Sequence, residues 1–198
     1  GNFKGCVDLV TMKAYIYDND KNDAPTITDC PEELKEKALG YRAELLEKLA
    51  SFDDDLMMMV LEGEEPDEEL IKKTIRKAVL TVKFFPVLCG TAYKNKCIQP
   101  LLDAVVAYLP SPLDIPGEKG TKNGEPYVCE ATDNKPFVGL AFKIATDPFI
   151  GRLAYVRVYQ GVLKSGSYVL NSSNGSKERI ARVVLMHANH RQDVEQLH

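Results

Sequence analysis

The sequence lacks the features that mark several special classes of protein. It has no Trp among 198 residues, and its 13 Gly and 11 Pro are too few for a collagen-like or low-complexity chain. No run of apolar residues approaches the roughly 18 needed to cross a bilayer. Its five cysteines form no Cys-x-x-Cys pair, so we expect reduced thiols. These absences together predict a soluble, cytoplasmic protein.

Catalytic and metal-binding motifs are missing as well. The segment most like a phosphate-binding loop, Gly117–Gly124, has the wrong glycine spacing for Gly-x-x-x-x-Gly-Lys-Ser/Thr. All three His fall in the last twelve residues, which leaves no Ser/His/Asp arrangement, and His187 and His190 have no third zinc ligand nearby. Asn95-Lys96-Cys97-Ile98 differs from the guanine-reading Asn-Lys-x-Asp, because Ile98 has no carboxylate. The sequence therefore predicts no catalytic centre and no metal site.

Charge is distributed very unevenly along the chain, although the net charge is only −4. Between Asp18 and Leu70, 18 acidic residues face 5 basic ones, a net of −13, whereas from Ile71 to His198 18 basic residues face 10 acidic ones, a net of +8. Such asymmetry favours two surfaces with different partners. A solvated acidic helix pair that only aids solubility is the alternative interpretation.

Hydrophobic spacing predicts strands and helices in the first half. Residues 3–17 show a period of two with a phase shift near Leu9 and Val10, which predicts a strand with a bulge or a bend there. Helices are expected from Pro31, from Asp54 and after Asp67. The apolar face expected for the first helix is Leu34, Ala38, Tyr41, Leu45, Leu49 and Phe52.

An α/β unit follows these helices. Phe84–Gly90 is expected to form a short apolar strand, with Pro86 favouring an edge strand or the start of a strand. A helix is expected from Pro100, and its buried stripe would be Leu101, Leu102, Val105, Val106 and Leu109.

The remainder of the chain has the pattern of an all-β domain. Pro and Gly accumulate between residues 110 and 124, which predicts a linker. Beyond it, four stretches with a period of two, separated by turn residues, favour a barrel or sandwich: 137–145, 153–159, 168–170 and 180–186.

Several long motifs resemble bacterial translation elongation factor G. Residues 84–96 (FFPVLCGTAYKNK) and 102–112 (LDAVVAYLPSP) are similar to the end of its GTP-binding domain. Residues 141–151 (AFKIATDPFIG), 157–161 (RVYQG), 165–167 (SGS) and 186–189 (MHAN) are similar to its second domain. Residues 5–14 (GCVDLVTMKA) and the acidic helices resemble the subdomain inserted in its GTP-binding domain.

The resemblance implies an internal fragment of a longer factor, whose phosphate loop, Asp-x-x-Gly loop and Asn-Lys-x-Asp would lie upstream. The implied fold class is α/β, the end of a Ras-like GTP-binding domain with an α+β inserted subdomain, followed by a partial all-β barrel. Residues 1–83 would be the inserted subdomain, 84–112 the last strand and helix of the GTP-binding domain, 113–126 a linker and 127–198 the incomplete second domain.

The resemblance also implies site residues, ligands and partners. Gly90-Thr91-Ala92 would be the residual guanine loop, with the Ala92 N–H donating to guanine O6, and Cys97 stands where the family commonly has Gly. The parent protein would bind GTP or GDP with Mg²⁺, while we expect the fragment to bind none and to be inactive. The acidic insert would contact the ribosomal stalk protein, and the second domain would contact small-subunit ribosomal RNA.

Particular charged residues are candidates for these contacts. The stalk-facing candidates are Glu36, Glu44 and Glu47, and the RNA-facing candidates are Lys143, Arg152, Arg157, Arg179 and Arg182. No membrane partner is expected. The open barrel edge, with Val138, Leu140, Phe142 and Ile144 as its inward set, predicts either self-association through that edge or a second domain that is markedly less stable than the first.

The parent function that the resemblance implies is a translocation GTPase, which couples GTP hydrolysis to movement of tRNA and mRNA. Two alternatives stay open: a paralogous ribosomal-protection or release-factor GTPase, and a stand-alone ribosome- or RNA-binding module. A phosphate loop encoded upstream of Gly1 would distinguish a factor fragment from a stand-alone module.

Overall fold

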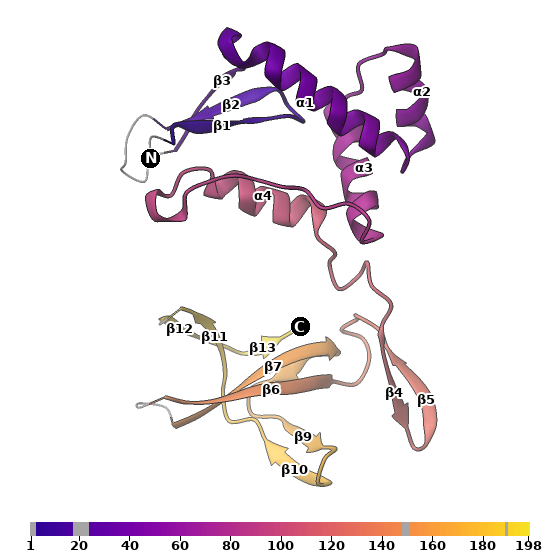
Figure 1. Cartoon of the computed structure of the whole chain (residues 1–198). Coiled ribbons are helices and arrows are strands. Elements are labelled where there is room, and N and C mark those ends of the chain that lie inside the picture. Colours follow the sequence, from indigo (N-terminus) through magenta and orange to yellow (C-terminus); the bar gives the residue numbers. More distant parts are fainter. Residues whose placement is uncertain (1–2, 18–23, 148–150, 189) are drawn as a thin grey trace. The chain divides into compact units, whose positions relative to one another are not determined.

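The chain divides into two units, Gly1–Pro110 and Ser111–His198 (Figure 1). The structure is a computed structural model that describes residues 3–17, 24–147, 151–188 and 190–198. The first unit contains β1 (Gly5–Asp8), β2 (Lys13–Ile16), β3 (Thr26–Asp29), α1 (Glu32–Ala50), α2 (Asp54–Glu62), α3 (Glu68–Leu80), the 3₁₀ turn η1 (Ala92–Lys94) and α4 (Ile98–Tyr108). The second contains β4 (Glu118–Lys122), β5 (Glu125–Cys129), β6 (Val138–Asp147), β7 (Gly151–Gln160), β8 (Leu163–Lys164), β9 (Tyr168–Asn171), β10 (Ser176–Arg179), β11 (Val183–His187), β12 (His190–Val194) and β13 (Gln196–Leu197).

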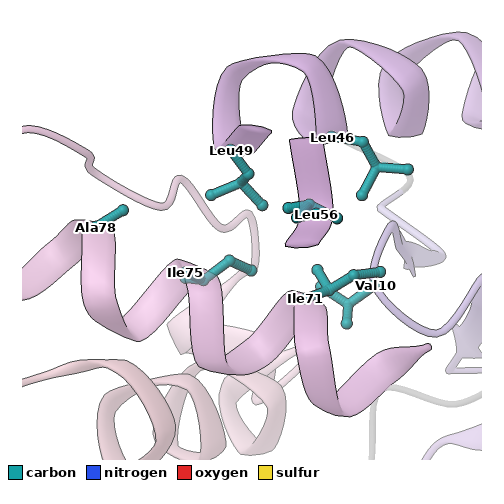
Figure 2. Close-up of a cluster of buried hydrophobic side chains, with 7 residues drawn as sticks. All are labelled: Val10, Leu46, Leu49, Leu56, Ile71, Ile75 and Ala78. Carbon is teal, nitrogen blue, oxygen red and sulfur yellow. The ribbon is translucent and has the colours of Figure 1, made fainter. Parts of the chain in front are cut away.

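Aliphatic side chains from three helices and from the turn between β1 and β2 form the core of the first unit (Figure 2). Helices α2 and α3 begin where the sequence predicts, because the Asp53 and Asp67 carboxylates accept hydrogen bonds from backbone N–H groups in the first helical turn. Each fully buried side chain of Leu or Ile size contributes roughly 1.5–3 kcal/mol. The cluster consists of Val10, Leu46, Leu49, Leu56, Ile71, Ile75 and Ala78.

The opening segment forms a hairpin rather than one strand with a bulge or a bend, and the chain reverses where the phase shift lies. β1 and β2 pair antiparallel, with Asp8 opposite Lys13, and β3 adds to the other edge of β2. The Asp8 carboxylate accepts from the Val10 N–H at 2.9 Å and from the Thr11 hydroxyl at 3.0 Å, and Met12 has a φ of +54°. A side chain that bonds the backbone two residues ahead favours a turn, so the phase shift marks a reversal of the chain.

The buried face of α1 is rotated from the predicted one. Tyr41 is 52% exposed, whereas Arg42 is only 7% exposed. The Arg42 guanidinium donates to the carbonyls of Leu9 and Val10 and to the Glu65 carboxylate, which satisfies its buried charge. A hydrophobic pattern could not find this face, because a charged residue stands at its centre.

The predicted strand at 84–90 and the predicted burial of the following helix are both wrong for this structure. Residues 84–90 form no strand, and Phe85 and Val87 are 71% and 94% exposed. Helix α4 forms, yet none of its residues is buried, and Val106 is 81% exposed. A strand needs a neighbouring strand for its hydrogen bonds, and no described strand lies beside these residues.

The described elements of the second unit are all strands, and they form antiparallel pairs: four are hairpins of consecutive strands, and the fifth joins β8 to β13 (Figure 1). All four predicted stretches contribute to strands, and β4 and the beginning of β5 lie within the segment 113–126 that was expected to be a linker. Gln160 is 2% exposed and ties β7 to the loop after β5: its Nε2 donates to the Pro136 carbonyl at 2.9 Å, and its Oε1 accepts from the Glu130 N–H at 3.2 Å.

Candidate functional site

Gly90, Thr91 and Ala92 lie in a tight loop that precedes α4. The N–H of Thr91 donates to the carbonyl of Lys96 at 3.0 Å, and the N–H of Lys96 donates back at 3.1 Å. The N–H of Asn95 donates to the carbonyl of Ala92 at 3.1 Å and closes η1. A Cβ at Gly90 would lie 2.9 Å from the Lys96 carbonyl oxygen, so the loop requires glycine at this position. The chain reversal therefore depends on a close backbone approach.

Cys97 ends this loop in a left-handed conformation, with a φ of +58°. A side chain with a Cβ pays roughly 1–2 kcal/mol there, whereas glycine does not. The resemblance to elongation factor G places Gly at this position, and the positive φ supplies the physical reason for that preference. Cys97 is 3% exposed, and its Sγ lies 2.8 Å from the Sγ of Cys6 in β1.

The loop on its own offers limited chemistry. Ala92 is exposed at the start of η1, where a backbone N–H can reach the edge of a base. Within the described ranges, no group of three or more His, Cys, Asp or Glu residues could hold a metal ion. The structure therefore brings Gly90, Thr91 and Ala92 together as one loop and shows, among the residues it describes, no metal site beside it.

Lys143 and Arg157 lie on the hairpin of β6 and β7. Lys143 is opposite Tyr155 in the strand register, and its Nζ lies 5.4 Å from the Tyr155 ring centroid. The Arg157 guanidinium lies 5.1 Å from the Tyr159 ring centroid. Because side chains alternate along a strand, residues 155 and 157 share one face of β7, and the contact with Arg157 brings the Tyr159 ring to that face although the register shifts there. The hairpin thus displays two cation–aromatic pairs on the same face.

The strand register places none of the three other basic candidates on this face. Arg152 is opposite Thr146 and, by alternation, lies on the other face of β7. Arg179 is opposite Tyr168 in the separate hairpin of β9 and β10, and Arg182 is exposed between β10 and β11. Only Lys143 and Arg157 are therefore placed together by the register of one hairpin.

The aromatic partners were missed by reasoning from charge alone. Tyr155, Arg157 and Tyr159 alternate with valines, so a period of two already places them on one face. Tyr168 is a further example, since the Lys177 Nζ lies 4.9 Å from its ring centroid. Basic and aromatic residues interleaved on a sheet can contact phosphates and stack bases.

The acidic candidates lie on α1. Glu36, Glu44 and Glu47 are all exposed, and Glu44 pairs with Lys48 at 2.6 Å. Because Glu36 and Glu47 are eleven residues apart, they project from nearly the same side of the helix, and Glu44 lies one turn from Glu47. The structure brings these carboxylates to one exposed surface of α1. Among the residues that the structure describes, no helix is long and apolar enough to span a membrane.

Comparisons with known proteins agree with this geometry. Residues 136–198 match the family model of elongation factor G domain 2. The fold is similar to a crystal structure from Thermus thermophilus, with a TM-score of 0.71 and 27% sequence identity over 96% of this chain. The chain spans 26% of the length of that solved protein. The resemblance to elongation factor G seen in the sequence is thereby confirmed: residues 136–198 match its second domain, and the fold of the chain is similar to part of a longer solved protein.

Proposed function

We propose that the chain is a segment of a translocation GTPase, which couples GTP hydrolysis to the movement of tRNA and mRNA through the ribosome. The match of residues 136–198 to elongation factor G domain 2 carries this proposal. GTP or GDP with Mg²⁺ would be the ligands of the longer protein, and most of their contacts would lie outside this chain. Such a factor works in the cytoplasm, where the ribosomes are.

Exposed apolar residues in the first unit support the assignment of residues 84–112 to the end of a Ras-like domain. Phe85, Val87 and Val106 are 71%, 94% and 81% exposed. Folded proteins rarely leave a segment and the following helix uncovered in this way. In a Ras-like sheet, 84–90 would gain a neighbouring strand and α4 would pack on the sheet face. Residues 1–83 would then be the subdomain inserted before this strand.

The loop Gly90-Thr91-Ala92 would read the guanine base in that domain. Its backbone is fixed by the paired hydrogen bonds between Thr91 and Lys96, at 3.0 and 3.1 Å. A preorganised N–H at Ala92 suits a base carbonyl, because an oxygen acceptor satisfies it without moving the loop. This role accounts for the glycine at position 90, which the close approach of the Lys96 carbonyl requires.

Two charged surfaces would meet the ribosome. The exposed carboxylates of α1 would contact the stalk protein. The face with Lys143, Tyr155, Arg157 and Tyr159 would contact small-subunit ribosomal RNA, since cations next to aromatic rings combine phosphate contact with stacking. An opposite charge on each surface fits two partners of different charge.

The test uses the longer protein that contains this chain together with its upstream sequence. We expect GTP hydrolysis that ribosomes accelerate, with movement of tRNA and mRNA in the same reaction. Hydrolysis that drives removal of tetracycline or of release factors instead would favour a paralogous GTPase, and a gene without an upstream phosphate loop would favour a stand-alone module. Either result would contradict the proposal.

A single substitution in the same protein tests the guanine loop. Ala92→Pro removes one N–H at the first position of a helical turn, where proline is tolerated. It should weaken GDP binding about 3- to 10-fold, the equivalent of one hydrogen bond. Ala92→Ser keeps the N–H and is the matched control. Equal affinity for GDP in the two variants would show that the loop does not contact the guanine base.

A further inference from the structure

Two cysteines far apart in the sequence meet where the opening sheet contacts the loop before α4. Cys6 lies in β1 and Cys97 immediately precedes α4, 91 residues later, yet their Sγ atoms are 2.8 Å apart. The same contact includes a hydrogen bond from the Lys96 Nζ to the Phe3 carbonyl at 3.4 Å. The two thiols are thus held together by the fold of the first unit.

The arrangement leaves little movement between the reduced and the bonded state. A disulfide places its sulfurs about 2.05 Å apart, so these atoms need to approach by less than about 1 Å. Cys97 is 3% exposed, while Cys6 is half-buried and is the more accessible of the two. The other cysteine of this loop region, Cys89, is exposed and provides a competitor for any test.

We propose that Cys6 and Cys97 are a dithiol–disulfide pair, oxidised by exchange with a small-molecule disulfide. The Cys6 thiolate attacks one sulfur of the small disulfide, and the first small thiolate leaves with the proton that Cys6 lost. The Cys97 thiolate then attacks the Cys6 sulfur of this mixed disulfide and expels the second small thiolate, which takes the Cys97 proton. Two protein thiols are oxidised, and one small disulfide is reduced to two thiols.

The protonation of the Cys6 thiol limits the rate of the exchange. Burial and the adjacent Cys97 thiol raise the pKa of Cys6, so little Cys6 thiolate is present at neutral pH. The first attack is therefore slow, and the second is fast because the Cys97 sulfur is already in place. The bond would fix β1 to the residue that immediately precedes α4 and would restrain the loop between Thr91 and Lys96. This inference does not depend on the proposed function.

Tryptic peptides make the pair directly measurable. Cleavage after lysine places Cys6 in the peptide 5–13, Cys97 in 97–119 and Cys89 in 84–94, each with a single cysteine. The reduced chain is incubated with oxidised glutathione, remaining thiols are alkylated, and a non-reducing digest is analysed by mass spectrometry. We expect peptide 5–13 joined to 97–119, with the loss of two hydrogens, as the dominant product in monomeric chains.

Variants at Cys89 and Cys97 test which cysteines form the disulfide. Cys89→Ser should keep this product, whereas Cys97→Gly, which suits the positive φ, should abolish it and leave Cys6 with glutathione or alkylated. The same oxidation in denaturant should scramble the pairs, which would show that the fold selects them. The proposal is overturned if Cys6 in the folded chain pairs mainly with Cys89, pairs between chains, or stays reduced under conditions that oxidise Cys89.

Discussion

Arg42 in α1 donates a hydrogen bond from its Nη1 to the carbonyl of Val10 at 2.7 Å, and so ties the helix to the turn between β1 and β2. The same nitrogen reaches the Leu9 carbonyl at 2.6 Å, and the Nε reaches the Glu65 carboxylate at 2.8 Å. One buried cation thus connects the sheet, α1 and the segment before α3. Its position in the core makes it a structural residue of the first unit.

Arg42→Met should lower the free energy of unfolding of the first unit by roughly 2–5 kcal/mol, because buried carbonyls lose their donor. Glu65→Gln is the control: the Glu65 side chain is 73% exposed, so its charge should contribute about 1 kcal/mol or less. Urea unfolding followed by the helical circular dichroism signal measures both, since the described helices all lie in this unit. Equal effects of the two substitutions would contradict this assignment.

Asp53 predicts a pH dependence of stability. The hydrogen bond from Lys77 at 3.2 Å, together with the Leu56 N–H, lowers the pKa of this carboxyl below its usual range. A lowered pKa in the folded state gives stability that is present above the unfolded pKa near 4 and is lost as pH falls through the folded pKa. Asp53→Asn should thus cost roughly 0.5–1 kcal/mol at pH 7, after allowance for the exposed Lys77, and less at pH 3. The urea midpoints of the variant and of the unmodified chain at both pH values test this. A stability difference that is the same at both pH values would show that the ionised carboxylate does not stabilise the fold.

The positive φ of Cys97 is tested by two substitutions that both remove the thiol. Cys97→Gly should be more stable than Cys97→Ala by about 1 kcal/mol, because only glycine adopts this conformation without strain. The same pair at Gln99, inside α4, should give the opposite order, since glycine weakens a helix. If the alanine variant at position 97 is the more stable one, the loop is not strained there.

Local signals in the sequence predict where the helices and strands form better than they predict which side chains are buried. Helix α3 follows from the Asp67 cap and a regular apolar face, both of which are read from neighbouring residues. The buried face of α1 could not be predicted, because the acceptors that stabilise Arg42 come from distant segments. The strand expected at 84–90 depends on a pairing partner, which periodicity does not reveal.

The candidate surfaces show the same limit. Sequence reasoning selected basic residues by type, and the strand register then separates Arg152 from Lys143 and Arg157. The aromatic neighbours Tyr155 and Tyr159 were readable from alternation, since they share the parity of Arg157. The contact between Cys6 and Cys97 was not readable, because nothing local to either residue indicates the other.

Charge reversal tests the acidic surface of α1. The triple variant Glu36→Lys, Glu44→Lys and Glu47→Lys should weaken binding to the ribosomal stalk protein and reduce its sensitivity to salt, because the attraction between opposite charges is lost. Reversing the exposed Glu118, Glu125 and Asp193 of the second unit changes the net charge equally and should have a much smaller effect. Titration calorimetry at two salt concentrations measures the affinity of both variants. Equal losses of affinity would show that the α1 surface acts only through the net charge of the chain.

Cosedimentation of the chain with small ribosomal subunits tests the central claim most directly. The chain should bind with an affinity that falls as salt rises, and Lys143→Ala with Arg157→Ala should weaken binding and lower the salt slope by about 2, one for each lost phosphate contact. Arg152→Ala removes a basic residue from the opposite face of the same strand and should leave most of the affinity intact. Absence of binding by the unmodified chain at low salt, or equal losses in these variants, would contradict the account of a ribosome-facing translation factor segment.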